Sequence, residues 1–125
     1  MKSKMKKRKV NKETAVYKRK IAKRELKLLD KLWSNNIKYR DESKCCICGD
    51  TKLVHTHHII PRERKATRHV FDNGVTICPL HHKYSFEISA HRNSFAFFLW
   101  FMRNRSEQFN KLVLLNDNIP NGQQV

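Results

Sequence analysis

The sequence predicts a small α+β protein, with a cysteine- and histidine-rich centre placed between a basic helix and an aromatic one. Three observations predict it. Lysine and arginine alternate with apolar residues at helical spacing over the first third of the chain. All four cysteines and six of the seven histidines fall within Cys45–His82. A run of aromatic and aliphatic residues, Phe95–Met102, follows. With 125 residues the chain is long enough for a single domain with one modest core.

Residues 1–12 are mostly basic and are expected to be a disordered tail, in which Met1–Lys9 settles along a phosphate backbone. Residues 13–36 are expected to form a basic amphipathic helix, with its regular part at Thr14–Asn35 and a stop at Asn35-Asn36. Apolar residues three and four positions apart place two neighbouring stripes on one broad face. The stripes consist of Tyr17, Ile21, Leu28 and Leu32, and of Ala22, Leu26, Leu29 and Trp33.

The cysteine spacing predicts a structural zinc site. Cys45 and Cys48 form a Cys-x-x-Cys knuckle followed by Gly49, and Cys78 and His81 repeat the spacing about thirty residues later. Three thiolates and one imidazole complete a closed tetrahedron. A redox pair is less favoured because nothing resembles a βαβ framework, and a disulfide is less favoured because no signal peptide precedes it. The remaining Cys46 is expected to be a small packed residue.

The unit at residues 37–92 should contain two strands and a short helix. We expect a first strand at Lys52–Ile60, a loop at 61–71, a second strand at Val75–Ile77, and a helix from Pro79 to about Ser89. A further helix, within residues 93–115, is expected from Phe95 to about Val113 with Ser94 as its cap. Residues 116–125 are expected to be a flexible tail.

The apolar run in the C-terminal helix predicts burial on all sides, against the apolar stripes of the N-terminal helix. A homodimer through this helix is the alternative to a monomer. Stacking of its aromatic side chains on unpaired bases is a third, less favoured interpretation.

The formal charge of +16 predicts a polyanionic partner. Residues 1–27 hold thirteen lysines and arginines against two glutamates. Nucleic acid suits this charge better than an acidic membrane, because no long hydrophobic face accompanies the basic cluster. The longest apolar run is far shorter than a bilayer span, and a cytoplasmic location is expected. The expected nucleic-acid contacts are Arg62, Arg64, Lys65 and Arg68 in the loop, and Lys20, Lys23, Arg24 and Lys27 on the helix.

Five separated elements in the order of one known pattern lie within Cys45–Lys83. They are Cys45-x-x-Cys48-Gly49, His57-His58-Ile59-Ile60-Pro61, Asn73, Cys78-x-x-His81 and His82. This third of the chain resembles the HNH nucleases of phages and bacteria, which include homing endonucleases and DNA-packaging nucleases. The resemblance implies a ββα-metal (His-Me finger) unit: two antiparallel strands and a helix holding one divalent ion. The chain departs from the pattern at His81, where the family usually has its fourth cysteine, and at His57, where many members have aspartate.

Carried over position by position, the resemblance implies a role for each residue. His58 corresponds to the general base, and Asn73 to the residue that braces the loop and helps to orient that base. His57 and His82 correspond to ligands of the catalytic metal, although His81 and His82 could exchange roles. His55, His69 and His91 are interpreted as ordinary solvated or packed residues, with His55 a candidate for supporting the site.

The predicted function is metal-dependent endonucleolytic hydrolysis of DNA, with duplex DNA as the expected partner. One structural zinc is expected to support the catalytic site. A neutral histidine suits water activation near pH 7, and a divalent ion suits charge stabilisation on the phosphate. The ion is expected to be Mg²⁺, Mn²⁺, Ni²⁺ or Zn²⁺; cobalt also suits a nitrogen-rich site. The alternative is a non-catalytic zinc-containing module that binds DNA or RNA.

Overall fold

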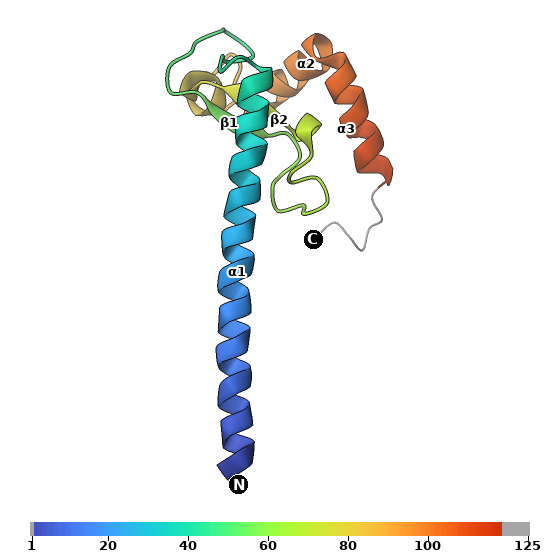
Figure 1. Cartoon of the computed structure of the whole chain (residues 1–125). Coiled ribbons are helices and arrows are strands. Elements are labelled where there is room, and N and C mark those ends of the chain that lie inside the picture. The colour runs from blue at the N-terminus through green and yellow to red at the C-terminus, as the bar shows by residue number, and fades with distance from the viewer. Residues whose placement is uncertain (1, 119–125) are drawn as a thin grey trace. The chain divides into compact units, whose positions relative to one another are not determined.

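The computed structural model describes the backbone of residues 2–118 and the side chains of residues 12–118 (Figure 1). The chain divides into two units, residues 1–32 and residues 33–125, which are described separately. The expected phosphate contacts of the side chains in Met1–Lys9 lie outside the described residues. Among the helices of residues 2–118, none has the length and apolar character that crossing a membrane requires.

Helix α1 spans Lys2–Arg40 and contains neither glycine nor proline. It begins earlier than the expected helix, in keeping with the good helix propensity of lysine and arginine. It also passes through the predicted stop at Asn35-Asn36, because Trp33 and Ile37 are buried and their packing outweighs the weak propensity of asparagine. The helix ends where Glu42 and Ser43 take positive φ angles and the Ser43 amide donates to the Lys38 carbonyl.

In the first unit, the apolar stripe expected to cover the aromatic helix is exposed. Tyr17 is 65% exposed, Leu28 57% and Leu32 50%. The packing of this stripe against the C-terminal helix therefore stays a prediction. Hydrophobic spacing identified the apolar face of the helix, but spacing carries no information on which surface covers that face.

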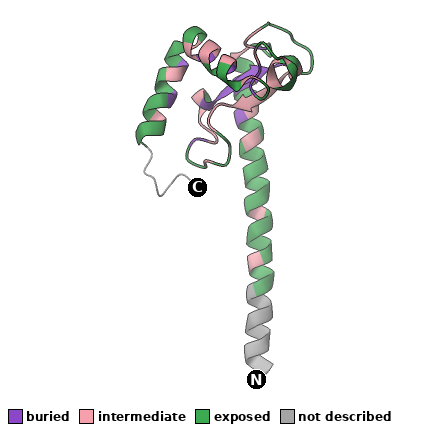
Figure 2. Ribbon diagram, turned by 180° about the vertical axis from the view of Figure 1, so that it is seen from behind, coloured by how far each residue is buried: buried purple, intermediate pink, exposed green. Residues whose placement is uncertain are grey.

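The second unit contains an antiparallel hairpin of β1 (His55–His58) and β2 (Gly74–Ile77). Its register pairs His55 with Ile77 and His58 with Gly74. The expected pair of strands is confirmed, although β1 is shorter than Lys52–Ile60. The four residues of β2 are all buried, and Figure 2 shows buried residues concentrated in this part of the chain.

A 3₁₀ turn, η1 (Phe71–Asn73), leads into β2, and a short π-helix, η2 (Leu80–Tyr84), follows it. The helix expected to reach about Ser89 thus ends after one turn. Ser85 leaves the helical conformation, and its amide donates to the Leu80 carbonyl. The five residues of η2 are enough to hold His81 and His82 on one helical turn.

The C-terminal region forms two helices, α2 (Ser94–Asn104) and α3 (Ser106–Asn118), where one was expected. The break lies at Arg105, whose side chain donates to Asp41 at 3.0 Å and to Gln108 at 2.7 Å. The cap of α2 is Asn93, which accepts from the Ala96 amide, and not Ser94. Because α3 continues to Asn118, the expected flexible tail does not begin at residue 116.

The core of the second unit joins the hairpin to α2 and α3 through Val75, Ile77, Phe97, Phe101 and Leu112. The apolar run of α2 is not buried on all sides as predicted: Phe95 is 71% exposed and Phe98 48%. Two strands and one further helix cover only one face of α2, so its other face remains at the surface.

Candidate functional site

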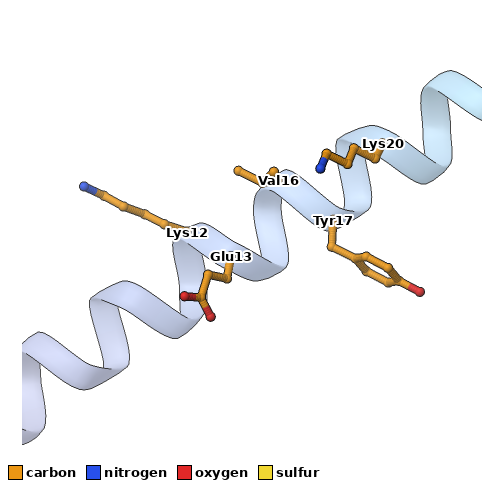
Figure 3. A pocket seen from close by; sticks show the side chains of 5 residues that line it. All are labelled: Lys12, Glu13, Val16, Tyr17 and Lys20. Atoms are coloured by element: carbon orange, nitrogen blue, oxygen red, sulfur yellow. The ribbon is translucent and has the colours of Figure 1, made fainter.

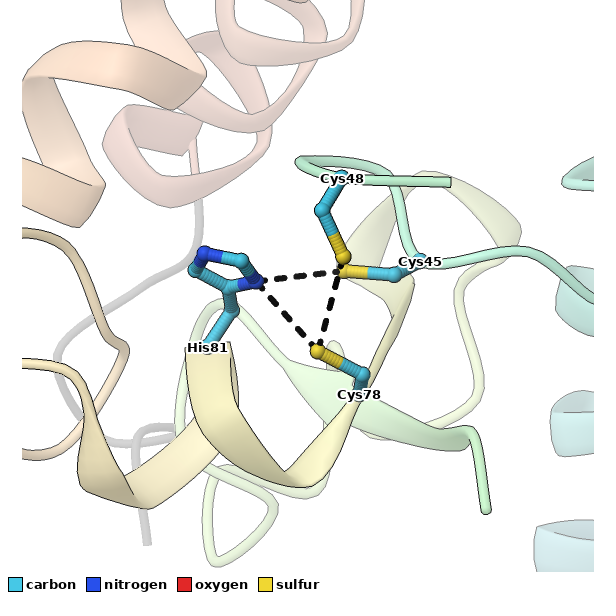
Figure 4. A group of neighbouring side chains, drawn as sticks. All are labelled: Cys45, Cys48, Cys78 and His81. Atoms are coloured by element: carbon cyan, nitrogen blue, oxygen red, sulfur yellow. Dashed lines mark hydrogen bonds between the residues drawn. The ribbon is translucent and has the colours of Figure 1, made fainter. Parts of the chain in front are cut away.

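The first candidate site is a cluster of Cys45, Cys48, Cys78 and His81 (Figure 4). One ligand atom from each residue lies within 4.8 Å of the others. The sulfurs of Cys48 and Cys78 are 3.7 Å apart, and His81 Nδ1 lies 3.3 Å from the Cys78 sulfur and 3.8 Å from that of Cys45. A tetrahedral zinc ion requires edges of about 3.8 Å between sulfurs and about 3.5 Å between sulfur and nitrogen. The cluster could therefore hold a structural zinc.

Local structure explains how these ligands meet. The knuckle turns at Gly49, which has a φ of 76° and donates its amide to the Cys45 carbonyl at 2.9 Å. The Cys46 amide donates to the Thr76 carbonyl at 2.9 Å and so fastens the knuckle to β2. Cys78 directly follows β2, and His81 lies on η2.

Cys46 differs from the three clustered cysteines because its thiol keeps its proton. Its thiol donates to the sulfur of Cys45, which lowers the pKa of Cys45 to about 3 and, together with burial, raises the pKa of Cys46 far above its ordinary value. Cys45 is therefore suited to bind metal as a thiolate, and Cys46 stays a protonated, partly buried residue.

The second candidate site is a cluster of three histidines, His57 on β1, His82 on η2 and His91 before α2. One ring nitrogen of each lies within 4.8 Å of the other two. His82 Nε2 and His91 Nε2 are 3.0 Å apart, as required of adjacent ligands on an octahedral ion with bonds of about 2.1 Å. Sequence reasoning missed His91, because no metal-ligand spacing connects it to His82. Folding brings it there: the His91 amide donates to the His82 carbonyl at 2.9 Å.

The histidine cluster is suited to bind a cation because burial disfavours the charged form of two of its rings, His57 and His82. Burial, together with the charges that His82 and His91 would carry, lowers the pKa of His57 to about 3. Burial and the neighbouring His55 lower the pKa of His82 to about 4. His55 Nε2 lies 2.5 Å from His82 Nδ1, an arrangement that fixes the orientation of the His82 ring. Three imidazoles leave other coordination positions open, as catalytic ions require.

His58, the predicted base, lies at the end of β1 with its ring stacked on Trp33. The ring centroids are 3.9 Å apart and the planes differ by 12°. His58 Nε2 lies 3.0 Å from the Arg68 carbonyl oxygen. Since only a protonated nitrogen can donate to a carbonyl, this contact places a proton on Nε2, and Nδ1 is the nitrogen that lacks a proton whenever the ring is neutral.

Asn73 is fully buried and holds the loop between the strands. Its side-chain oxygen accepts from the Ile60 amide at 2.7 Å, and its nitrogen donates to the carbonyls of Ile60 and Thr67 at 3.1 and 2.9 Å. Thr67 directly precedes Arg68, whose carbonyl binds His58. Asn73 thus fixes the backbone that orients His58.

One groove of about 870 Å³ contains both His58 and the histidine cluster. Its lining comes from β1, the following loop, η2 and the segment before α2. The lining residues are Thr56, His57, His58, Ile59, Pro61, Arg62, Glu63, His82, Lys83 and His91. Arg62, Glu63 and Lys83 bring charge to the groove, and the Arg62 guanidinium group lies 3.8 Å from the Glu63 carboxylate.

The other predicted contact residues have different surroundings. Arg64 binds Asn116 through its guanidinium group, and Lys65 is exposed. In the first unit, Lys20, Lys23, Arg24 and Lys27 are exposed on α1. Figure 3 shows the preceding turns of the same helix, where Lys12, Val16 and Lys20 form one line of side chains and Glu13 and Tyr17 a second. These side chains come from one helix and include no cysteine or histidine, so they form no metal site.

The fold and sites define a small α+β protein with a cysteine-histidine cluster that could hold zinc. Comparisons with protein-family models, curated proteins and solved structures found no match to this chain.

Proposed function

We propose that this chain is an HNH-type, metal-dependent endonuclease that hydrolyses phosphodiester bonds in DNA. The observation that carries the proposal is the position of His58. It lies in one groove with His57, His82 and His91, and its hydrogen bond to a backbone carbonyl leaves Nδ1 as the basic nitrogen. A binding module has no need of a basic histidine beside a second cluster of metal ligands.

The order of elements supports the same proposal. An antiparallel hairpin followed by a short helix agrees with the ββα unit implied by the resemblance, although η2 has only five residues. His57 and His58 come from the first strand and His82 from the helix, as the proposed roles require. His81 joins the sulfur cluster, which leaves His82 with the histidines.

The proposed chemistry begins with removal of a proton from water by His58 Nδ1. The water oxygen bonds to phosphorus while the bond from phosphorus to the 3′ oxygen breaks, and that oxygen leaves with a proton from solvent. Arg62 and Lys83 offer positive charge to the phosphate oxygens. A divalent ion held by His57, His82 and His91 would supply Lewis-acid stabilisation of the phosphate charge. The products carry a 5′ phosphate and a 3′ hydroxyl.

Asn73 has a positioning role in this proposal. Its three hydrogen bonds fix Ile60 and Thr67 on either side of the loop, and the carbonyl next to Thr67 belongs to Arg68. Loss of Asn73 would release that carbonyl and with it the orientation of His58. Activity would fall without any change in the metal ligands.

The proposed partner is duplex DNA, which the exposed basic side chains of residues 12–32 would contact through phosphates. Such contacts carry no sequence information. They predict binding that weakens steeply as salt rises.

The experiment that tests the function is nicking of supercoiled plasmid by the zinc-loaded protein with Mg²⁺, Mn²⁺, Ni²⁺ or added Zn²⁺. We expect cleavage by the wild type and its loss in His58→Ala, by a factor of about 10² or more. His69→Ala is the matched control, because His69 lies outside the groove lining and should leave cleavage unchanged.

Zinc content and DNA affinity are measured for the same variants. His58→Ala should retain both, since His58 belongs to neither candidate metal cluster. Cleavage retained in His58→Ala would assign the base elsewhere. Tight, salt-dependent DNA binding without cleavage under any metal would identify the chain as a non-catalytic zinc-containing module.

A further inference from the structure

Two phenylalanines on α2 remain at the surface although the same helix contributes to the core. Phe95 is 71% exposed and Phe98 48%, whereas Phe97 and Phe101 are buried. Phe95 and Phe98 are three residues apart and so share one face of the helix. Asn93 caps this end of α2 and also donates to the carbonyls of Phe86 and Glu87, which fixes where the helix starts. The two rings therefore stand on a firmly held helix end.

The exposed rings line a hollow of about 490 Å³. Its lining is mostly apolar and contains no charged side chain. The lining residues are His57, Ile59, Ala90, Ser94, Phe95, Phe97, Phe98 and Phe101. The volume is in the range of small-molecule sites, which are commonly about 300–1,000 Å³. An uncharged aromatic ring system fits this chemistry, and a phosphate does not.

The hollow adjoins the groove that holds the histidine cluster. His57 and Ile59 line both. The ring of Phe97, at the floor of the hollow, lies with its centroid 5.7 Å from that of His57. A charged groove for a phosphate and an aromatic hollow for a flat ring thus meet at one metal-ligand residue. A single nucleotide has the matching arrangement, with a charged phosphate next to a flat aromatic base.

We propose that Phe95 and Phe98 form a stacking site for an unpaired nucleobase next to the phosphate bound at the histidine cluster. The inference rests on the proposed function and names its substrate class: DNA that is single-stranded or locally unpaired at the cleavage position. A base still paired within a duplex has both faces covered by its neighbours and offers no free face to the two rings. Stacking on aromatic side chains accepts any base, so the site selects for unpairing and not for sequence.

A second copy of the chain is a less suitable occupant. Phe95 and Phe98 together offer on the order of 200–250 Å² of exposed aromatic surface. A stable protein interface needs about 800 Å² from each partner. The hollow between the rings and His57 also favours a small flat group over a broad protein surface.

The test measures binding in the His58→Ala protein, loaded with zinc and Ni²⁺, so that no cleavage interferes. The probe is a single-stranded oligonucleotide carrying one 2-aminopurine, compared with the same strand in a full duplex. We expect binding to quench the 2-aminopurine fluorescence in the single strand. Phe95→Leu with Phe98→Leu, which keeps apolar volume but removes the rings, should weaken single-strand binding by roughly 5- to 150-fold and abolish the quenching. Duplex affinity should change less than twofold.

Phe86→Leu is the matched control. Phe86 is also strongly exposed, at 70%, but it lies outside the hollow beneath the Arg92 guanidinium group. It should leave quenching and affinity unchanged. Equal loss of single-strand and duplex affinity in the double variant, or unchanged quenching, would overturn the proposal. A dimer that the double variant dissociates, with oligonucleotide binding intact, would also overturn it and assign the rings to an interface between copies.

The proposed stacking site and the proposed nuclease fail in different measurements. If the wild type cleaves no DNA but quenching depends on Phe95 and Phe98, the base site stands and the nuclease assignment does not. If the wild type cleaves and quenching is absent, only the stacking site is refuted.

Discussion

Trp33 fills the space that a side chain at Gly74 would need. A Cβ added to Gly74 would lie 2.5 Å from Trp33 Cζ2 and would also contact Ile37 Cδ1. The same indole stacks on His58 and donates to the Val70 carbonyl at 2.9 Å. The close approach of α1 to β2 therefore positions the imidazole proposed as the base.

Gly74→Ala should destabilise the protein and displace Trp33. Because the clash is with a rigid ring and a buried isoleucine, we expect a loss of about 1–3 kcal/mol in the free energy of unfolding. Cleavage should fall with it, since His58 loses the surface on which it stacks. Chemical denaturation followed by circular dichroism measures the first effect, and plasmid nicking the second.

Gly49→Ala is the comparison for Gly74→Ala, because it tests the cost of a left-handed backbone conformation without a steric clash. Gly49 has a φ of 76°, but an added Cβ would meet no atom within 4 Å. We expect a cost of about 1–2 kcal/mol from the left-handed conformation alone, with Trp33 undisturbed. If Gly74→Ala were no more damaging than Gly49→Ala, the packing of Trp33 over β2 would not be tight.

Removal of zinc from the sulfur cluster should unfold the second unit. Cys78→Ser is expected to reduce zinc content by one equivalent and to lower the melting temperature sharply, because metal binding contributes directly to folding. Native mass spectrometry counts the ions, and a thermal melt reports stability. Cys46→Ser is the matched control and should keep the zinc, since Cys46 is not among the four clustered residues. Equal zinc loss in both variants would show that Cys46 is a ligand.

His91→Ala should weaken binding at the histidine cluster without affecting the structural zinc. Loss of one of three imidazoles is expected to reduce Ni²⁺ affinity at least tenfold. Titration calorimetry on protein already loaded with one zinc measures this affinity, with His69→Ala as the control. Unchanged affinity in His91→Ala would leave His57 and His82 as the only protein ligands from this cluster.

The sulfur cluster and the hairpin could be predicted because both leave local marks in the sequence. The Cys45-x-x-Cys48 spacing and the Cys78-x-x-His81 spacing each bring two ligands to one ion by a single turn. The predicted strands, Lys52–Ile60 and Val75–Ile77, are both rich in β-branched residues, which favour strands. These features depend on a few consecutive residues, which is the range over which sequence patterns are informative.

The remaining features depend on contacts between distant residues. His91 joins His82 through the path of the chain after η2, which no spacing encodes. The break between α2 and α3 depends on Arg105 reaching Asp41, 64 residues away in sequence. The exposure of Phe95 depends on how much surface the hairpin can cover, and an apolar run contains no information on that area.

Asp41 connects three parts of the second unit and predicts how stability depends on pH. Its carboxylate accepts from the Arg40 and Arg105 guanidinium groups, at 2.8 and 3.0 Å, and from the Thr76 amide at 2.9 Å. Burial alone would raise its pKa, but the Arg40 and Thr76 hydrogen bonds and the charge of Arg105 outweigh burial and lower the pKa to about 2. The side chain is only 5% exposed, so solvent screens these contacts weakly.

Because the pKa is lower in the folded state than in the unfolded state, the carboxylate stabilises the protein above the unfolded value of about 3.9. This contribution, about 2 kcal/mol, is lost as the pH falls from about 4 through the folded value. Asp41→Asn should remove it at neutral pH and flatten the dependence of unfolding free energy on pH between about 4 and 2. Denaturation curves at pH 7, 4 and 2.5 measure both effects. Asp50→Asn is the control, because the side chain of Asp50 lies at an exposed position, where it accepts from the Lys52 amide. An Asp41→Asn protein that loses stability in acid as steeply as the wild type would show that Asp41 does not connect α1, β2 and the break between α2 and α3.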